Sequence, residues 1–115
     1  MLFTDYHISQ IRSGSKTVTR REWERRRAVP GNVYIASTEM FTSHDEADCY
    51  IRVTDVYQQP LGEMSDEDAR WEGEYEDLAD FRAGYEMVYG EGSWAPSKTV
   101  WVVEFEYVGR ERPDD

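Results

Sequence analysis

Residues 14–21 read Gly14-Ser15-Lys16-Thr17-Val18-Thr19-Arg20-Arg21, and the fold of the chain is predicted outward from this stretch. The β-branched residues Thr17, Val18 and Thr19 favour an extended strand. Side chains alternate between the two faces of a regular strand, which would separate Lys16 from Thr19. The two side chains can reach one face only if the chain turns or bulges after Gly14.

The sequence on either side of this stretch predicts a helix before it and a hairpin after it. Thr4 can cap a short helix over residues 5–12, and Gly14 can end that helix in the left-handed conformation. A turn at 30–32 leads into a strand at 33–36. Residues 42–48 then separate two extended segments, 38–41 and 49–57, which we expect to form a hairpin.

The second half of the sequence predicts two helices and a long strand. Ser65 and Asp68 have the spacing of a capping box, which predicts a short helix toward Glu72 that ends at Gly73. A second helix is expected at 76–89, because four apolar residues recur there at helical spacing: Leu78, Phe81, Tyr85 and Val88. Residues 98–108 are rich in branched and aromatic side chains and predict a strand buried on both faces. These elements together predict an α+β domain built on a small mixed sheet or barrel with two or three peripheral helices.

Length and composition favour one domain. A chain of 115 residues, 39% of them hydrophobic, can build a core without disulfides or metals, and we expect the domain at 1–108 and a frayed tail at 109–115. The single Cys49 cannot form an internal disulfide, and one Cys with two His offers no spacing typical of a metal site. No cofactor is therefore expected. Because the sequence has no membrane-spanning stretch and no signal-peptide pattern, we expect a cytoplasmic protein with no membrane partner.

The charge is acidic overall but basic in one segment. The 24 acidic residues outnumber the 13 basic ones and give a net charge of -11, a composition that resembles the halophilic proteins of haloarchaea. On this interpretation most carboxylates form a hydrated surface that keeps the protein dispersed in concentrated salt. Residues 12–27 instead hold seven basic and two acidic side chains, a local charge of +5. An anionic ligand such as RNA or a nucleotide requires such a patch.

The order of these features resembles that of the ASCH domain family, which belongs to the PUA-like β-barrels. Residues 14–21 fit the pattern G-x-K-x-x-T-x-R, and residues 51–56, 68–73 and 101–105 add further agreement. The resemblance implies a PUA-like small mixed β-barrel with two or three peripheral helices. It also implies a partner that is RNA or a modified nucleoside. In the branch that the sequence resembles most, N4-acetylcytidine amidohydrolases hydrolyse the acetyl amide with a Lys, a Thr and a Glu.

The resemblance places candidate catalytic residues at Lys16, Thr19 and Glu72. Three other carboxylates remain alternatives to Glu72: Glu67, Glu74 and Glu76. Amide hydrolysis needs a nucleophile and a base, and a Thr19 hydroxyl beside a Lys16 amine whose pKa is lowered by burial can supply both. Glu72 can orient Lys16 or carry a proton to the leaving nitrogen.

One set of basic and aromatic residues is expected to bind the RNA or the nucleoside: Arg20, Arg21, Trp23, Arg25, Arg26 and Arg27. Trp23 lies in a polar run and is the best candidate for stacking on a base, whereas Tyr34, Trp71, Tyr85 and Trp94 are more typical of a core. The same residues have a purely structural interpretation. Lys16 and Glu72 can form an ion pair, and residues 25–27 can neutralise the acidic body or contact an acidic helix of another subunit.

Three functions remain open from the sequence. The protein can be a non-catalytic module that binds RNA or a nucleoside, an amidohydrolase acting on an N4-acylcytidine-type substrate, or an RNA-cleaving ASCH nuclease. Cleavage has the least support, because neither His is well placed to act as a general acid or base. We expect His7 on a helix face and His44 in a polar hairpin loop.

Overall fold

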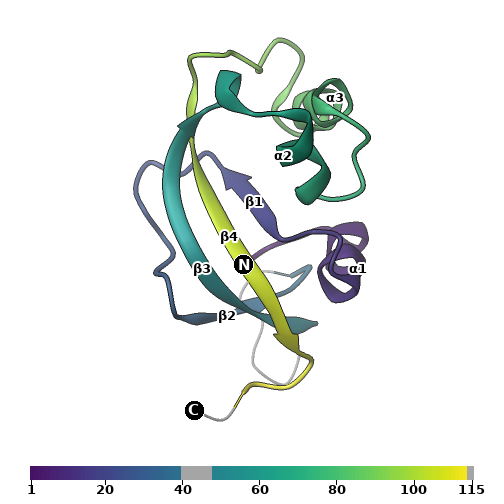
Figure 1. Ribbon diagram of the computed structural model, residues 1–115, viewed down its shortest axis with the longest axis vertical. Coiled ribbons are helices and arrows are strands. Elements are labelled where there is room, and N and C mark those ends of the chain that lie inside the picture. Colours follow the sequence, from purple (N-terminus) through teal and green to yellow (C-terminus); the bar gives the residue numbers. More distant parts are fainter. Residues whose placement is uncertain (40–47, 114–115) are drawn as a thin grey trace.

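The computed structural model describes residues 1–39 and 48–113, and its centre is a curled four-stranded sheet (Figure 1). The strands are β1 (Val18–Arg21), β2 (Val33–Ala36), β3 (Cys49–Pro60) and β4 (Thr99–Gly109). Their order in the sheet is β1-β4-β3-β2, and each neighbouring pair is antiparallel. An isolated parallel bridge joins Leu2 to Ser37. The sheet forms half of a barrel, open on the side where the helices stand.

Three helices stand together on the right of Figure 1: α1 (Asp5–Ser13), α2 (Asp66–Trp71) and α3 (Leu78–Tyr89). A short 3-10 turn, η2 (Leu61–Glu63), connects β3 to α2. The predicted α+β domain, a small mixed sheet or barrel with two or three peripheral helices, is confirmed. The four strands pair antiparallel, and the bridge between Leu2 and Ser37 is parallel. Among the described residues, no helix has the length and apolar character of a membrane-spanning segment.

The helix boundaries follow from local capping. The Thr4 side chain accepts a hydrogen bond from the His7 amide, and α1 ends at Gly14, whose φ of 88° is the left-handed conformation that the sequence predicted. Ser65 and Asp68 form the predicted capping box at the start of α2. The start of α3 differs from the prediction. Asp77 caps the first turn, so the helix begins at Leu78 rather than at residue 76.

The predicted buried face of α3 is correct only in part. Phe81 and Tyr85 are buried and pack against each other and against Trp94. Val88, which we predicted on the same face, is 75% exposed. The helix ends one residue later at Tyr89, so Val88 lies in its last turn.

The predicted hairpin is present, but its first strand lies earlier in the chain. β2 pairs with the first residues of β3, from Ala36 opposite Cys49 to Val33 opposite Arg52. Thr38 and Glu39, which we predicted as strand, form a bend instead, and residues 40–47, including the predicted loop and His44, lie outside the described residues. On its other side β3 pairs with β4, from Tyr50 opposite Gly109 to Pro60 opposite Thr99. The register of this pairing shifts after Tyr50 and again after Val53.

The core is divided between the two ends of the sheet. At one end α1 packs Ile8 and Ile11 against Ile51 and Phe105. At the other end α2 and α3 pack against a cluster that comprises Leu61, Met64, Ala69, Phe81, Tyr85, Trp94 and Val100. Each cluster is stabilised by removing apolar surface from water. Because α1 belongs to one cluster and α3 to the other, a space remains between these two helices beside β1.

Candidate functional site

A cavity of about 580 Å³ lies between the start of α1, the strand β1 and the helix α3. This volume is in the range of pockets that hold small molecules. One part of its lining is polar or charged and includes His7, Lys16, Thr19, Arg20, Arg21 and Glu72. The other part is aromatic and includes Phe3, Tyr75, Phe81, Tyr85 and Tyr89. The cavity therefore joins charged groups to flat apolar surfaces.

Lys16 and Thr19 reach the same cavity because Lys16 precedes the strand. β1 begins at Val18, so strand alternation does not apply to Lys16. The amides of Ser15 and Lys16 both donate to the carbonyl oxygen of Gln10, at 2.9 and 3.2 Å, which holds the chain against the end of α1. The turn after Gly14 that the sequence required is thus present.

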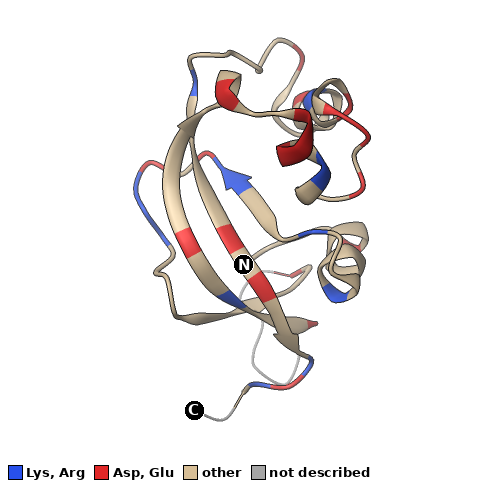
Figure 2. Cartoon of the chain, viewed as in Figure 1, with Lys and Arg blue, Asp and Glu red and all other residues tan. Residues whose placement is uncertain are grey.

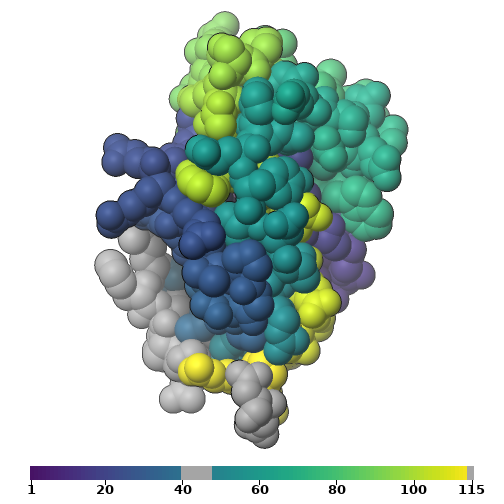
Figure 3. All heavy atoms as spheres, turned by 60° about the vertical axis from the view of Figure 1, so that its left-hand side comes forward, coloured from purple at the N-terminus to yellow at the C-terminus, as the bar shows by residue number. Residues whose placement is uncertain are grey.

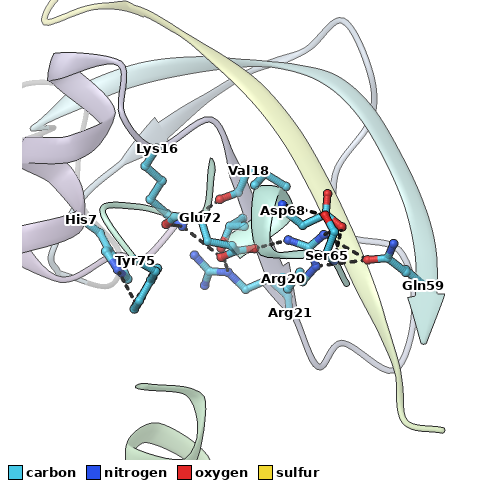
Figure 4. Close-up of polar contacts among 11 residues, drawn as sticks. His7, Lys16, Val18, Arg20, Arg21, Gln59, Ser65, Asp68, Glu72 and Tyr75 are labelled. Atoms are coloured by element: carbon cyan, nitrogen blue, oxygen red, sulfur yellow. Dashed lines mark hydrogen bonds and ion pairs between the residues drawn. The ribbon is translucent and has the colours of Figure 1, made fainter. Parts of the chain in front are cut away.

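The Lys16 ammonium is buried in a cage of three acceptors (Figure 4). Its Nζ donates to the carbonyl oxygens of Glu72 at 2.7 Å and of Val18 at 2.8 Å, and to Glu72 Oε1 at 3.3 Å. The side chain is 2% exposed. Burial lowers the pKa of Lys16, the charges of Arg21 and Arg20 lower it further, and Glu72 opposes this shift. All three N–H donors of the ammonium have partners.

Glu72 is shared between two buried cations. Its Oε2 accepts a hydrogen bond of 2.7 Å from Arg20 Nη1, while Oε1 faces Lys16. The other side of the Arg20 guanidinium donates to Gln59 Oε1, at 3.3 Å from Nε and 3.0 Å from Nη2. Glu72 follows the last residue of α2 and is 4% exposed. This carboxylate, rather than the exposed Glu67, Glu74 or Glu76, is the one that meets Lys16.

Arg20 has a different place from the one we predicted. We expected it to bind RNA or substrate, but its side chain is 2% exposed and is held by Glu72 and Gln59. Strand alternation explains this, because neighbouring residues of β1 point to opposite sides. Arg20 lies at the edge of the cavity, where its guanidinium orients the Glu72 carboxylate.

Thr19 and Arg21 lie on the same side of β1 and contact each other. Arg21 Nε donates to Thr19 Oγ1 at 3.1 Å, and Arg21 Nη2 donates to the carbonyl oxygen of Leu2 at 2.7 Å. The guanidinium carbon lies 4.8 Å from the centroid of the Phe3 ring, a cation–π distance. Burial lowers the pKa of Arg21, although a guanidinium keeps its charge in proteins.

His7 and Tyr75 form a hydrogen-bonded pair in the wall of the cavity that the sequence did not predict. His7 Nε2 lies 3.3 Å from Tyr75 Oη (Figure 4). Burial lowers the pKa of His7 to about 4, and the charges of Lys16 and Arg21 add to this effect. Burial also raises the pKa of Tyr75. Both groups are therefore neutral at neutral pH.

Comparison with known proteins identifies the family. A family model of the ASCH domain matches residues 3–109. The chain belongs to the ASCH domain family. ASCH domains are generally RNA-binding or hydrolytic. The family that the motif at residues 14–21 resembled is thereby confirmed.

Two solved structures are similar to this ASCH domain. The ASCH domain from Lactobacillus crispatus JV V101 has a TM-score of 0.72 and 16% identity, over 94% of this chain and 77% of that chain. Protein EF3133 from Enterococcus faecalis V583 has a TM-score of 0.65 and 20% identity, over 89% of this chain and 66% of that chain. These likenesses confirm the PUA-like fold. Comparison with the curated proteins gives no match.

The remaining predicted ligand-binding residues of this ASCH domain do not line the cavity. Trp23 is half-buried and packs against the cluster of Ala28, Val53 and Val103. Residues 25–27 are exposed in the β1–β2 connection, at the left of Figure 1 and away from the helices. Figure 3 shows this connection, in blue, projecting beside β3, in teal. Any RNA contact at residues 25–27 is thus separate from the cavity.

Among the aromatic residues that we expected in the core, only some are there. Trp94 is buried in the cluster under α3, whereas Tyr85 is buried and also lines the cavity. Trp71 is 49% exposed at the end of α2. The cavity between α1 and α3 is also lined by His7, Tyr75 and Tyr89. No local pattern in the sequence indicates this arrangement, since these residues come from three separate segments.

Proposed function

We propose that this ASCH domain binds RNA or a modified nucleoside in the cavity and hydrolyses an N4-acylcytidine-type amide there. The observation that supports this proposal is the meeting of Lys16, Glu72 and Thr19 in the wall of one cavity. Lys16 and Glu72 are 56 residues apart in the chain and share a hydrogen bond. Such a convergence of a hydroxyl, an amine and a carboxylate is the arrangement that acyl transfer requires.

In the proposed reaction Thr19 is the nucleophile. Its Oγ1 forms a bond to the acyl carbon while its proton passes to the Lys16 amine. Arg21 Nε already donates to Thr19 Oγ1, which favours the developing negative charge on that oxygen. The C–N4 bond then breaks, N4 takes up a proton, and cytidine leaves. Water finally hydrolyses the threonyl ester, which releases the carboxylate and restores the hydroxyl.

The environment of Lys16 suits the role of a base. Burial and two neighbouring guanidinium groups lower the pKa of Lys16, which increases the fraction of neutral amine. A neutral amine has two N–H groups, enough for the carbonyl oxygens of Val18 and Glu72, and one lone pair that can take up the Thr19 proton. Once protonated, Lys16 again donates to Glu72 Oε1, and this third bond is the path by which the proton can be passed on to the leaving nitrogen.

The aromatic walls support a flat ligand. Tyr75, in the segment before α3, and Tyr89, the last residue of α3, line the cavity, and Phe3 lines it next to Arg21. A pyrimidine ring stacks favourably on such side chains, whichever base it belongs to. The cavity thus supplies a stacking surface beside the groups that carry out the chemistry.

RNA cleavage is the second candidate, and His7 is the observation that favours it. The sequence placed His7 on a helix face, but its ring lines the cavity and is hydrogen-bonded to Tyr75. His7 is a neutral imidazole at neutral pH because its pKa is lowered to about 4; this makes it a weak base, so its position in the cavity lining is what supports this candidate. Mass analysis of a short RNA after incubation separates cleavage from deacylation.

The deciding experiment is incubation with N4-acetylcytidine and chromatographic detection of cytidine. We expect the wild-type protein to release cytidine and Thr19→Val to lose activity by about 100-fold or more. Thr17→Val is the matched control, because Thr17 lies two residues away and outside the cavity lining. Thr19→Ser keeps a hydroxyl and should retain part of the activity.

Two results would count against the proposal. If no cytidine forms and neither RNA nor nucleosides bind, the cavity does not have this function. If cytidine forms but Thr19→Val is as active as Thr17→Val, the substrate is right and the mechanism is wrong. Titration of the same variants with nucleosides distinguishes a loss of binding from a loss of chemistry.

A further inference from the structure

The cations of the cavity are not equally neutralised. Lys16 and Arg20 are both paired with Glu72, at 3.3 and 2.7 Å. Arg21 is different, because within residues 1–39 and 48–113 no carboxylate lies at ion-pair distance from its guanidinium. Asp5, the other carboxylate in the lining, is exposed and forms no ion pair with Arg21. One positive charge of the cavity therefore lacks a counter-charge.

Arg21 is nevertheless held firmly. Its Nε donates to Thr19 Oγ1, its Nη2 donates to the Leu2 carbonyl oxygen, and its plane lies near the Phe3 ring. All three partners are neutral. A guanidinium has five N–H donors, and only two of these have a partner among the described residues. The group is thus oriented in advance, with donors left over for a ligand.

A half-buried cation without a nearby anion has lost part of its hydration, and an anionic ligand can supply the missing charge. Burial lowers the pKa of Arg21, which shows that its surroundings disfavour the charged form, yet the guanidinium stays protonated at neutral pH. A phosphate group fits the need, because its oxygens accept two parallel hydrogen bonds from one guanidinium. The nearby rings of Phe3 and Tyr89 leave space for the attached base.

We propose that the ligand of this cavity carries a phosphate group that pairs with Arg21. This inference rests on the proposed function, and it specifies the ligand as a nucleotide rather than a neutral nucleoside. The phosphate can come from two sources: the 5′-monophosphate of a free nucleotide, or the internucleotide phosphodiester of an RNA. Both present the same oxygens to Arg21.

The experiment compares three ligands: cytidine, cytidine 5′-monophosphate and the dinucleotide CpC. Each is titrated calorimetrically into the wild-type protein and into Arg21→Gln at low ionic strength. We expect the monophosphate or CpC to bind roughly 10- to 100-fold more tightly than cytidine to the wild type, as charge-assisted hydrogen bonds to phosphate would produce. Arg21→Gln should reduce this preference, taken as the ratio of the two affinities within the same variant, to about threefold or less.

The matched control is Arg26→Gln, which removes an exposed arginine outside the cavity and should keep the full preference. If Arg21→Gln does not fold, Arg21→Lys keeps the charge but loses the planar pair of donors, and we expect an intermediate preference. Tighter binding of CpC than of the monophosphate identifies the phosphodiester as the source, and the reverse identifies the free nucleotide.

The proposal and the function on which it rests fail in different ways. Equal affinity of the wild type for cytidine and for both phosphorylated ligands overturns the role of Arg21 and leaves nucleoside binding intact. A preference for phosphate that persists in Arg21→Gln also overturns it. Absence of binding by all three ligands instead removes the proposed function, and the phosphate proposal falls with it.

Discussion

Replacing Glu72 by Gln tests whether one carboxylate holds two buried cations together. The substitution keeps the size and shape of the side chain and removes only its charge. In the wild type Glu72 accepts from Lys16 and Arg20, whose side chains are each 2% exposed. After the change Lys16 remains buried without a counter-ion and Arg20 keeps only the more distant Asp68 carboxylate, at 4.0 Å, because the amide oxygen of Gln can still accept a hydrogen bond but carries no net charge.

The expected loss of stability is large. Breaking a buried ion pair by removing one partner costs about 3–5 kcal/mol. Small domains unfold with free energies of about 5–15 kcal/mol, so the Glu72→Gln variant should fold but should be markedly weakened. For a chain of this size we expect the melting temperature to fall by about 12–20 °C.

The loss should depend on pH in a direction that follows from Lys16. Burial lowers the pKa of Lys16 below its ordinary value of 10.5 in the folded state, and Glu72 partly offsets this. Without Glu72 the folded-state pKa falls further. Between that pKa and 10.5 the unfolded chain binds more protons than the folded one, so stability rises with pH in this window. The stability difference between wild type and Glu72→Gln should therefore shrink from pH 7 toward pH 10.

Urea denaturation followed by circular dichroism measures these free energies of unfolding. Glu67→Gln is the matched control, since Glu67 is exposed on the same helix, and it should change stability by about 0.5 kcal/mol or less. The double variant Lys16→Met/Glu72→Gln should be more stable than Glu72→Gln alone, because it removes one unpaired ammonium. Two results would refute the reasoning. One is a loss below about 1 kcal/mol in the free energy of unfolding for Glu72→Gln; the other is a double variant whose loss equals the sum of the losses of Lys16→Met and Glu72→Gln.

Three further predictions concern other parts of the molecule. Burial lowers the pKa of His7 from 6.5 to about 4, so the wild type should lose stability as the pH falls from 6.5 to 4 while His7→Asn loses less, as thermal melts at several pH values will show. Gly73→Ala should lower the free energy of unfolding, measured in urea, by about 1–3 kcal/mol, since φ at Gly73 is +154° and the added Cβ would lie 2.5 Å from Gln10 Oε1. Gly90→Ala should lower it less, because Gly90 also has a positive φ but no atom lies near its added Cβ. Burial raises the pKa of Cys49 to about 11, so the folded protein should react with a thiol reagent far more slowly than the protein in urea, and equal rates would contradict the buried position.

The sequence predicted best those helix ends and strands that depend on residues close together in the chain. Thr4 and Gly14 bound α1, and Ser65 with Asp68 begins α2, because capping depends on residues within one turn of the helix. β4 was predicted within one residue at each end, since its branched and aromatic side chains favour a strand wherever it lies. The turn after Gly14 was predicted only as a condition for Lys16 and Thr19 to share one face, and the structure meets that condition.

The elements that the sequence could not predict depend on contacts between distant segments. The choice of Glu72 over its acidic neighbours follows from the position at which α2 ends against Lys16, which no local pattern determines. The pairing of His7 with Tyr75 requires α1 to lie beside the segment that leads into α3. Val88 has the spacing of the buried face of α3, but it lies exposed in the last turn and lines the cavity.

The charge pattern of the whole protein explains why this one site can be basic. Figure 2 shows many acidic residues, in red, in α2, α3 and their connections, and basic residues, in blue, at the end of β1 and in the β1–β2 connection. Consecutive residues of β1 point to opposite sides, so Arg20 turns toward the carboxylates of α2 while Arg21 turns toward the cavity. One arginine is thus used to orient Glu72 and the other is left with free donors beside Thr19. Because the two roles belong to adjacent positions of one short strand, Arg20→Gln should affect stability first, whereas Arg21→Gln should affect ligand choice first.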